Sequence, residues 1–403
     1  MILPQVQVTL SCNLNCRYCF QDHSSPFIME EKTVDSIITK CSDYIRDECL
    51  FPRKLEMIWH GGEPLLAGID FYRKVIDLQL NHCDIRFINK IQTNGTLMTE
   101  PFAEFFNDFN FHVGFSIDGP EELHNRNRIM DPEGAGSFES AIRGIENFRK
   151  YGEHPLVSVL AVITRQTIET GAKKFYDFFR ELGAEVQLDP YDVTCNPSSI
   201  GDIAWQAAEF MPSPEAYCKF LVELFDLWFY DKPGNIQFKE LKHAVKLALC
   251  PDIKVTSIKD KKRCSEFRTI FDPYGRVYSC DMYINNEKTS LGNINEDSIS
   301  LIIARKQHVW ERIKDIFRSD DKIFNCHSCS YGDRCSGGCL TCMKYNAALS
   351  MGYTLENMPE VMCEDYFSKT FPNNGASFYC EAYRKCGIHI EQAVYQEMLN
   401  REK

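Results

Sequence analysis

The sequence lacks the features that mark membrane, secreted and nucleic-acid-binding proteins. No apolar run reaches the roughly 18 residues that a membrane-spanning helix needs. The first ten residues have neither a basic segment nor a long apolar run, so we expect no signal peptide. The chain has no block of five or more Lys and Arg residues, and its net charge is -12. Binding of a phosphate backbone is therefore disfavoured. We predict a cytoplasmic protein whose partners are neither nucleic acid nor membrane.

Cysteine, by contrast, is abundant, with 19 in 403 residues. The chain is too long for a small disulfide-stapled domain and carries no export signal. In a reducing compartment, clustered cysteines more often bind metal or carry out redox chemistry. The spacing is uneven, because three cysteines lie within residues 12–19 and five lie within residues 326–342. These two clusters are the candidate metal-binding regions.

The first half of the chain alternates between strand-like and helix-like segments. Strands separated by helices at this interval predict a parallel sheet with right-handed crossovers. Six such units favour a partial (β/α)6 barrel over a complete eight-fold barrel. The expected strands are residues 6–10, 54–59, 86–92, 111–116, 157–162 and 185–189, and the expected helices are residues 31–46, 71–81, 101–106, 137–151 and 171–182.

Beyond residue 196 the pattern changes. Residues 213–230 and 238–249 read as amphipathic helices, residues 271–278 as a hairpin, and residues 388–400 as a final helix. The chain is α/β in class. We predict three domains: the partial barrel over 1–195, a helical bridge over 196–253, and a small cysteine-rich α+β domain over 254–403.

The first cysteine cluster follows the first expected strand directly. Cys12, Cys16 and Cys19 form a C-x3-C-x2-C run, so three thiolates can face one metal centre from a single loop. A structural zinc normally takes four protein ligands. A [4Fe–4S] cluster held by three thiolates leaves one iron open to a chelating ligand. From spacing alone, a zinc site with a distant fourth ligand stays open as an alternative.

This run, with Phe20 straight after its last cysteine, resembles the signature loop of radical S-adenosylmethionine (SAM) enzymes. The resemblance implies that the open iron binds the amino and carboxylate groups of SAM. It also implies cleavage of SAM to methionine and a 5′-deoxyadenosyl radical, which removes hydrogen from an unactivated C–H bond. The stretch Gly61-Gly62-Glu63-Pro64 resembles the GGEP motif of the family, which implies contacts with the SAM ammonium group.

Further motifs lie where the next strands are expected to end. By resemblance, the stretches at 92–96 and 116–120 contact the ribose and carboxylate of SAM. Arg128 lies in a stretch resembling H-D-x-x-R, with Asn125 in place of the aspartate. Two roles are open for Arg128, namely pairing with the SAM carboxylate or forming a surface ion pair with an acidic side chain. The resemblance covers roughly residues 6–190, and its full cofactor-binding set is Phe20, Gly61, Gly62, Glu63, Pro64, Gln92, Asn94, Ser116, Asp118, Arg128 and Leu188.

The later cysteines resemble the SPASM pattern C-x9-15-G-x4-C, gap, C-x2-C-x5-C-x3-C, gap, C, with Gly275 as its glycine. A zinc ribbon would explain the C-x2-C pair alone. The resemblance implies two auxiliary [4Fe–4S] clusters, which with the first make three. The implied ligands of one auxiliary cluster are Cys264, Cys280 and Cys339, and those of the other are Cys326, Cys329, Cys335 and Cys380, with Cys363 as an alternative to Cys380.

One position departs from the sulfatase-maturating members of this family. They carry a further cysteine six residues after the first SPASM cysteine, where this chain has Ile270. We therefore expect an open iron in the first auxiliary cluster, able to bind a substrate thiolate, unless Cys218 or Cys250 completes it.

Cys280-Asp281 resembles a Cys-Asp pair of the sulfatase maturases, in which the aspartate is proposed to take the substrate's proton. We expect Asp281 to be buried, to have a raised pKa and to act as the catalytic base. An aspartate that caps a turn is the alternative.

The resemblance implies an oxidoreductase that acts on a peptide or protein. Our first expectation is maturation of a ribosomally made peptide by a C–C, C–S or C–O crosslink or another radical modification. The alternative is an anaerobic sulfatase-maturating enzyme that oxidises Cys or Ser to formylglycine, and the second alternative is a non-enzymatic iron–sulfur or zinc protein. Expected partners are the substrate and an electron donor such as flavodoxin or ferredoxin. Because the chain begins at the first strand, a separate leader-binding protein is a further candidate partner.

Overall fold

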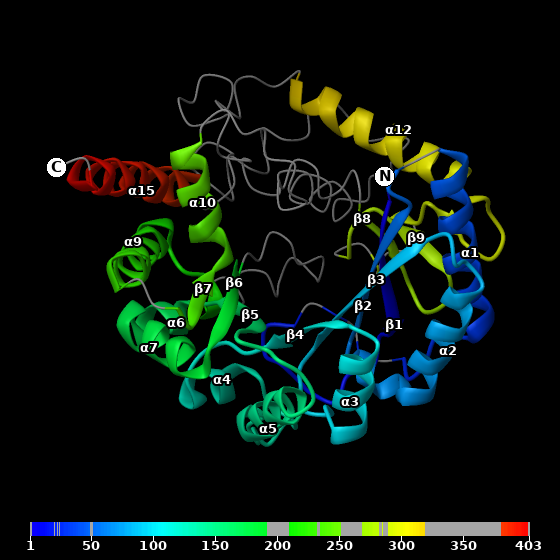
Figure 1. The fold of residues 1–403 in the computed structure, drawn as a ribbon, viewed down its shortest axis with the longest axis horizontal. Helices are drawn as coiled ribbons and strands as arrows, with labels where there is room; N and C mark the ends of the chain where they lie inside the picture. The colour runs from blue at the N-terminus through cyan, green and yellow to red at the C-terminus, as the bar shows by residue number, and fades with distance from the viewer. Residues whose placement is uncertain are drawn as a thin grey trace.

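The computed structural model describes residues 2–19, 21, 23, 25–48, 51–191, 209–231, 234–250, 268–281, 284, 289–318 and 380–401. In these ranges the strands form one sheet in the order β10-β9-β8-β1-β2-β3-β4-β5-β6-β7. The sheet curves, and helices line its outer side (Figure 1). The strands are β1 (Leu3–Thr9), β2 (Lys54–Gly61), β3 (Arg86–Thr93), β4 (His112–Ser116), β5 (Val157–Ile163), β6 (Ala184–Pro190), β7 (Ile236–Phe238), β8 (Arg268–Phe271), β9 (Arg276–Tyr278) and β10 (Gly292–Asn293).

Strands β1 to β6 pair in chain order and in parallel, which confirms the predicted partial barrel. The predicted helices are present to within a few residues at each end, except that α15 begins at Cys380 rather than at residue 388. The helices are α1 (Glu31–Asp47), η1 (Pro64–Ala67), α2 (Ile69–Leu80), α3 (Glu100–Asp108), α4 (Glu121–Asn127), α5 (Phe138–Arg149), α6 (Arg165–Thr170), α7 (Ala172–Leu182), α9 (Pro214–Asp231), α10 (Lys239–Leu249), α12 (Ile299–Arg318) and α15 (Cys380–Arg401).

The apolar core lies between the sheet and its outer helices, and strand alternation builds it. On β2, Leu55, Met57 and Trp59 have no exposed surface and belong to this core. Successive side chains of a strand point to opposite faces. The intervening residues, Ile58 and His60, therefore face the inner side of the curved sheet. The same alternation leaves polar side chains of β1 on the inner side.

The sheet extends beyond the six predicted strands at both edges. β7, within the predicted bridge, pairs in parallel with β6. At the other edge β8 pairs in parallel with β1, and β9 returns antiparallel to β8, as the predicted hairpin requires. Gly275 closes that turn with a φ of 84°, a conformation that favours glycine. Segments of all three predicted domains thus share one sheet, and the domain boundaries themselves stay a prediction.

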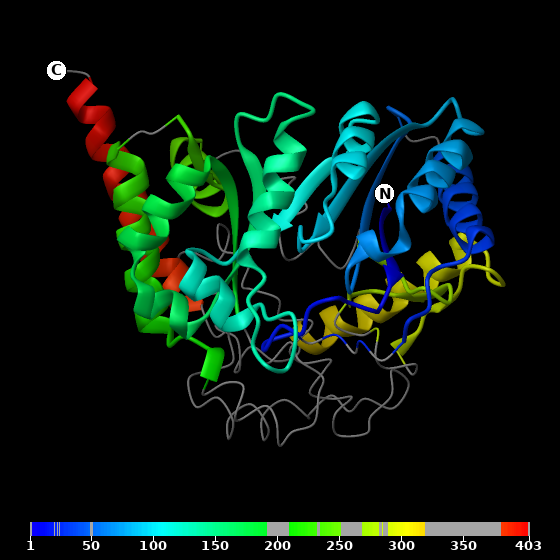
Figure 2. The ribbon, with the colours of Figure 1, turned by 90° about the horizontal axis from the view of Figure 1, so that it is seen from below.

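The helices that follow the barrel pack at its two edges. α9, α10 and α15 lie side by side next to β6 and β7, and α12 lies against α1 (Figures 1 and 2). The His389 imidazole lies 2.7 Å from the Asp226 carboxylate and joins α15 to α9. α15, the last described helix, therefore packs against the helices beside the barrel.

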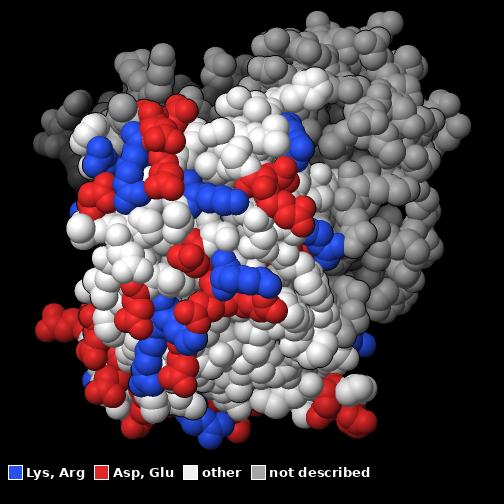
Figure 3. Space-filling model, turned by 90° about the vertical axis from the view of Figure 1, so that its right-hand side faces the viewer, with Lys and Arg blue, Asp and Glu red and all other residues white. Residues whose placement is uncertain are grey.

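Charges of both signs are interspersed on the face shown in Figure 3. Several of them pair across elements, as Arg46 and Arg53 do with Asp84. This arrangement offers no broad patch of one sign on that face. Among the described residues, none of the helices has the length and apolar character needed to cross a membrane.

Gly144 sets the distance between α5 and the chain segment that follows β3. A Cβ added at Gly144 would lie 2.0 Å from the Gly95 carbonyl oxygen. We predict that Gly144→Ala lowers the free energy of unfolding by about 1–3 kcal/mol, because the helix must shift away from that oxygen. Denaturant unfolding of the protein measures this loss.

Gly234→Ala is the matched control, since its added Cβ would meet no atom within 4 Å. We expect that variant to unfold like the parent protein. Equal stability of both variants would show that α5 does not pack as described.

Candidate active site at the carboxyl ends of the parallel strands

The loop with the first three cysteines follows β1 and is fastened to the end of β3 by polar side chains. Asn13 Nδ2 donates to Thr96 Oγ1 at 2.8 Å, and Asn94 Nδ2 donates to Asn13 Oδ1 at 2.9 Å. Asn94 Oδ1 in turn accepts from the Thr96 amide at 2.9 Å. Asn94 was predicted to contact SAM, and here it also orients the loop. The parts played by Asn13 and Thr96 were not predicted, although both lie within or beside the motifs.

A second segment supports the same loop through the backbone. The Asn15 amide donates to the Ile129 carbonyl at 2.7 Å, and the Arg17 amide donates to the Asn127 carbonyl at 2.9 Å. The segment just after α4 therefore runs along the cysteine loop. The resemblance pointed to Arg128 in this segment but gave no sign of this backbone pairing.

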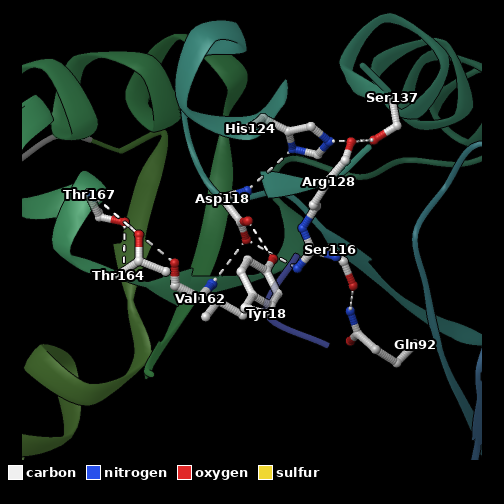
Figure 4. A network of polar contacts seen from close by, with 10 residues as sticks. All are labelled: Tyr18, Gln92, Ser116, Asp118, His124, Arg128, Ser137, Val162, Thr164 and Thr167. Carbon is white, nitrogen blue, oxygen red and sulfur yellow. Dashed lines mark hydrogen bonds and ion pairs between the residues drawn. The ribbon is translucent and has the colours of Figure 1, made fainter. Parts of the chain in front are cut away.

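Asp118 joins the cysteine loop to the ends of β4 and β5 (Figure 4). Its carboxylate accepts from Tyr18 Oη at 2.5 Å, from Arg128 Nη2 at 3.1 Å and from the Val162 amide at 3.1 Å. The side chains of Asp118 and Arg128 are 1% and 8% exposed, so this is a buried ion pair and not the surface pair considered from the sequence. The Arg128 guanidinium also lies 5.5 Å from the centroid of the Tyr18 ring.

Protonation states in this network follow from burial. Burial raises the pKa of the Tyr18 phenol, so the phenol keeps its proton and donates it to Asp118. Burial lowers the pKa of His124 to about 3, so the imidazole is neutral at physiological pH. Ser137 Oγ donates to the Arg128 carbonyl at 2.7 Å and therefore accepts from His124 Nε2 at 3.0 Å. This tautomer leaves His124 Nδ1 facing the Asp118 amide at 3.5 Å.

Gly61 and Gly62 are glycines because the backbone packs tightly there. The Gly62 amide donates to the Thr9 carbonyl at 2.8 Å, and the Glu63 amide donates to the Ser11 carbonyl at 2.9 Å. A Cβ at Gly61 would lie 2.2 Å from the Thr9 oxygen, and one at Gly62 would lie 2.1 Å from the Ser11 oxygen. The motif thus fits directly against the end of β1, where the cysteine loop begins.

Glu63 points into the protein and has no exposed surface. One carboxylate oxygen accepts from the Leu65 amide at 2.9 Å and from Thr93 Oγ1 at 2.7 Å, and the other accepts from the Asn94 amide at 2.8 Å. Burial raises its pKa to about 7, against the opposing effect of these hydrogen bonds. Both oxygens accept from the chain's own donors, so Glu63 joins the ends of β2 and β3. Its predicted contact with SAM stays a prediction.

The other predicted cofactor contacts lie in different surroundings. Gln92 Nε2 donates to Ser116 Oγ at 2.9 Å, which brings the ends of β3 and β4 together (Figure 4). Pro64 is buried at the start of η1. Leu188 lies in the apolar core, and its amide donates to Glu240 at 2.9 Å. Phe20 lies outside the described residues.

The donor set of the loop fits a [4Fe–4S] cluster. Cys12, Cys16 and Cys19 are free thiols of intermediate exposure. Burial raises the pKa of Cys12 to about 11 and that of Cys16 to about 12, whereas for Cys19 the hydrogen bond and charge of His23 outweigh burial and lower the pKa. Within the described ranges, no three His, Cys, Asp or Glu side chains converge on a single ion. Thiolates of a cubic cluster bind separate irons and need no such convergence, so these residues suit a cluster better than zinc.

Asp281 follows β9 on the inner side of the barrel, and its environment corrects one expectation. Its carboxylate accepts from Gln5 Nε2 at 3.1 Å and from Cys280 Sγ at 3.4 Å, and it lies 3.9 Å from the Arg268 guanidinium. Burial alone would raise its pKa, but the charges of Arg268 and His60 and these hydrogen bonds lower it overall. The predicted raised pKa is therefore wrong, because the sequence gave no sign that Arg268 and the hydrogen-bond donors lie around this carboxylate.

Most predicted auxiliary ligands lie outside the described residues, namely Cys264, Cys326, Cys329, Cys335 and Cys339, together with the alternative Cys363 and the side chain of Cys380. Of the two substitutes considered, Cys218 is half-buried on α9 and Cys250 is exposed at the end of α10. Ile270 is fully buried and pairs with Gln5 and Tyr278 in the sheet. The ligand sets of the auxiliary clusters therefore stay predictions.

Two family models match this chain. The model of the radical SAM superfamily matches residues 6–173, and that of the SPASM iron-sulfur cluster-binding domain matches residues 264–330. A serine-type anaerobic sulfatase-maturating enzyme of Bacteroides thetaiotaomicron is 31% identical over 97% of this chain and 89% of its own length. A cysteine-type anaerobic sulfatase-maturating enzyme of Clostridium perfringens is 29% identical over 90% of this chain and 94% of its own length.

Solved structures agree with these sequence matches. The structure of native anSMEcpe with bound AdoMet and Cp18Cys peptide has a TM-score of 0.74 and 25% identity, and the match covers 99% of both chains. Streptococcus suis SuiB bound to the precursor peptide SuiA has a TM-score of 0.57 and 17% identity, covering 90% of this chain and 76% of SuiB. The likeness to SuiB shows a shared fold alone.

The two family matches imply SAM and [4Fe–4S] clusters as cofactors, which confirms the prediction. They also exclude the non-enzymatic binding protein considered as an alternative. The geometry agrees, because the cysteine loop is fixed by residues at the ends of β3, β4 and β5. The chain belongs to the radical SAM enzymes that carry a SPASM domain, in the family of the anaerobic sulfatase-maturating enzymes.

Proposed function

We propose that this protein is an anaerobic sulfatase-maturating enzyme that oxidises a cysteine or serine of a protein substrate to formylglycine. The observation that carries this proposal is the similarity to the serine-type enzyme of Bacteroides thetaiotaomicron, which spans 97% of this chain. The similarity to the cysteine-type enzyme of Clostridium perfringens leaves the choice between the two substrate residues open.

This proposal reverses the order of our sequence expectations. Crosslinking of a ribosomally made peptide was preferred, partly because Ile270 replaces a maturase cysteine. The full-length relatives are maturases, whereas the likeness to the SuiB structures is of fold alone. Ile270 remains a difference from the maturase pattern. It supports a first auxiliary cluster whose ligand set differs from that pattern.

The described residues support particular roles in this reaction. We assign Cys12, Cys16 and Cys19 to the SAM-binding cluster, which together with SAM supplies a radical able to remove hydrogen from a carbon. We assign Asp281 as the acceptor of the substrate's thiol or hydroxyl proton. Gln5 holds this carboxylate on the inner side of the barrel, where a substrate side chain is expected.

Substrate, partners and location complete the proposal. The substrate is a segment of a sulfatase, and the electron donor is a flavodoxin or ferredoxin, as the resemblance implied. A leader-binding protein is not needed for such a substrate. The cytoplasm remains the expected location.

The direct test is formylglycine formation by anaerobically purified and reconstituted enzyme. With SAM, a reductant and a synthetic peptide spanning the modified site of a sulfatase, we expect 5′-deoxyadenosine together with a formylglycine peptide. The variant with Cys12, Cys16 and Cys19 all changed to Ala should form neither and should contain about four fewer irons per chain.

Cys83→Ala is the matched control, because this cysteine is exposed and lies outside every predicted cluster. It should keep both iron content and activity. SAM cleavage by the triple variant at the parent rate would refute the ligand assignment. A crosslinked peptide without formylglycine would instead refute the proposed reaction.

Asp281→Asn tests the proton acceptor. We expect formylglycine formation to fall about 100-fold or more, because general base catalysis is lost while the shape of the side chain is kept. SAM cleavage without peptide should continue at the parent rate, since Asp281 acts on the substrate alone. Mass spectrometry of the peptide and chromatography of 5′-deoxyadenosine give the two readouts.

Asp70→Asn serves as its control, because the Asp70 side chain is 83% exposed on α2. That variant should match the parent in both assays. Equal product formation by Asp281→Asn and the parent would leave Asp281 with a structural role only.

A further inference from the structure

The inner side of β1 carries two glutamines in a row. Val6 and Val8 belong to the apolar core outside the sheet, so strand alternation turns Gln5 and Gln7 to the inner side. Gln5 uses its amide to hold Asp281, the proposed proton acceptor. Gln7 lies two residues further along the strand, about 6.6 Å toward the cysteine loop.

The side-chain amide of Gln7 has no hydrogen-bond partner among the described residues, although it is completely enclosed. Its exposed fraction is 0%, and neither Nε2 nor Oε1 has a partner. His60 pairs with Gln7 in register across β1 and β2, and its buried Nδ1 also has no partner. Gln7 Nε2, Gln7 Oε1 and His60 Nδ1 thus form a group of unsatisfied polar atoms between Asp281 and the end of β2 at Gly61.

Buried polar atoms without partners lower the stability of the fold. A second buried glutamine of this chain has its amide fully paired. Gln79 is also buried, but both ends of its amide bond to Asn89 at 2.9 Å. A buried polar atom without a hydrogen-bond partner destabilises the fold and is rare in native proteins. We therefore expect that the Gln7 amide gains a partner when the enzyme binds its ligands. An apolar side chain in place of Gln7 would fill the same space without that cost.

A peptide group is the chemical complement of this site. The Gln7 amide offers a donor and an acceptor side by side, and a peptide main chain presents a carbonyl and an N–H. A substrate segment held at Gln7 would place a side chain one or two residues away beside Asp281. The neighbouring His60 adds a further nitrogen able to bond the same segment.

We propose that Gln7, with His60 opposite, binds a main-chain amide of the substrate next to the residue that is oxidised. This inference rests on the proposed function, since it takes a protein segment as the substrate. It assigns Gln7 to substrate binding and not to SAM binding or to the fold.

Gln7→Met tests the inference, because methionine keeps the size of the side chain and removes its hydrogen-bonding atoms. The measurements are calorimetric binding, with SAM present, of a sulfatase peptide whose reactive residue is replaced by Ala, the KM values for the reactive peptide and for SAM, and thermal unfolding. We expect the peptide's Kd and KM to rise about tenfold through loss of its hydrogen bonds. The KM for SAM, the peptide-independent SAM cleavage and the thermal midpoint should stay at parent values, or the midpoint should rise.

Gln79→Met is the matched control and should behave in the opposite way. Its loss leaves Asn89 Nδ2 without its partner, while Asn89 Oδ1 keeps only the hydrogen bond from Trp59 Nε1 at 2.9 Å. The thermal midpoint should therefore fall while peptide binding stays unchanged. A Gln7→Met variant that loses stability with unaltered peptide binding would overturn the inference, because the amide would then serve the fold through a buried water. A higher KM for SAM alone would overturn it in favour of the cofactor.

Failure of the proposed function gives a different result. If the parent enzyme binds SAM but neither binds nor oxidises the sulfatase peptide, the function is wrong and this inference falls with it. If the parent enzyme oxidises the peptide and Gln7→Met binds it equally well, only the inference fails.

Discussion

The site depends on one buried carboxylate. Asp118, 1% exposed, accepts hydrogen bonds from Tyr18 in the cysteine loop, from Arg128 after α4 and from the Val162 amide on β5. A charge so far from water is stable only when its partners are in place, since removal of one partner of a buried pair typically costs about 3–5 kcal/mol. The loop that is to hold the cluster is therefore fixed relative to the ends of β4 and β5. These neighbours give the loop its shape. The thiols add contacts of their own, such as the hydrogen bond from the Leu14 amide to Cys12 at 3.4 Å and the one between Cys19 and His23.

The same principle extends along the carboxyl ends of the strands. Glu63 links the end of β2 to the end of β3, because its carboxylate accepts from Thr93 Oγ1 and from the Asn94 amide. The Asn94 side chain in turn donates to Asn13 in the cysteine loop. These groups form a frame at the carboxyl ends of the strands. Inside that frame, β1 presents Gln5 toward Asp281, and the Gln7 side chain has no partner in the part of the chain that the structure describes. Residues that hold the loop thus differ from those that we propose to contact the substrate.

Sequence reasoning found the motifs but did not find the hydrogen-bond partners that their side chains have within the protein. Cysteine spacing and period-two and period-3.6 patterns are local, so the first cluster, β1 to β6 and their helices could be predicted. The partners of Asp118 could not, because Tyr18 lies 100 residues away in the chain and no local pattern links the two. The lowered pKa of Asp281 was missed because no sequence pattern shows that the Arg268 charge on β8 and the Gln5 amide on β1 both reach this carboxylate. β7 and β10 were missed because strands of three and two residues are too short to show alternation.

The measurement that tests this account most directly is the iron content and stability of Asp118→Asn. Asparagine keeps the size of the side chain but leaves the Arg128 charge uncompensated. We predict that the free energy of unfolding of the iron-free protein falls by about 3–5 kcal/mol. After anaerobic reconstitution, about four irons per chain should be missing and SAM cleavage should be lost, while the auxiliary irons remain. Asp131→Asn, in a surface turn, should match the parent protein. Full iron content with unchanged SAM cleavage in Asp118→Asn would contradict the claim that this carboxylate positions the loop.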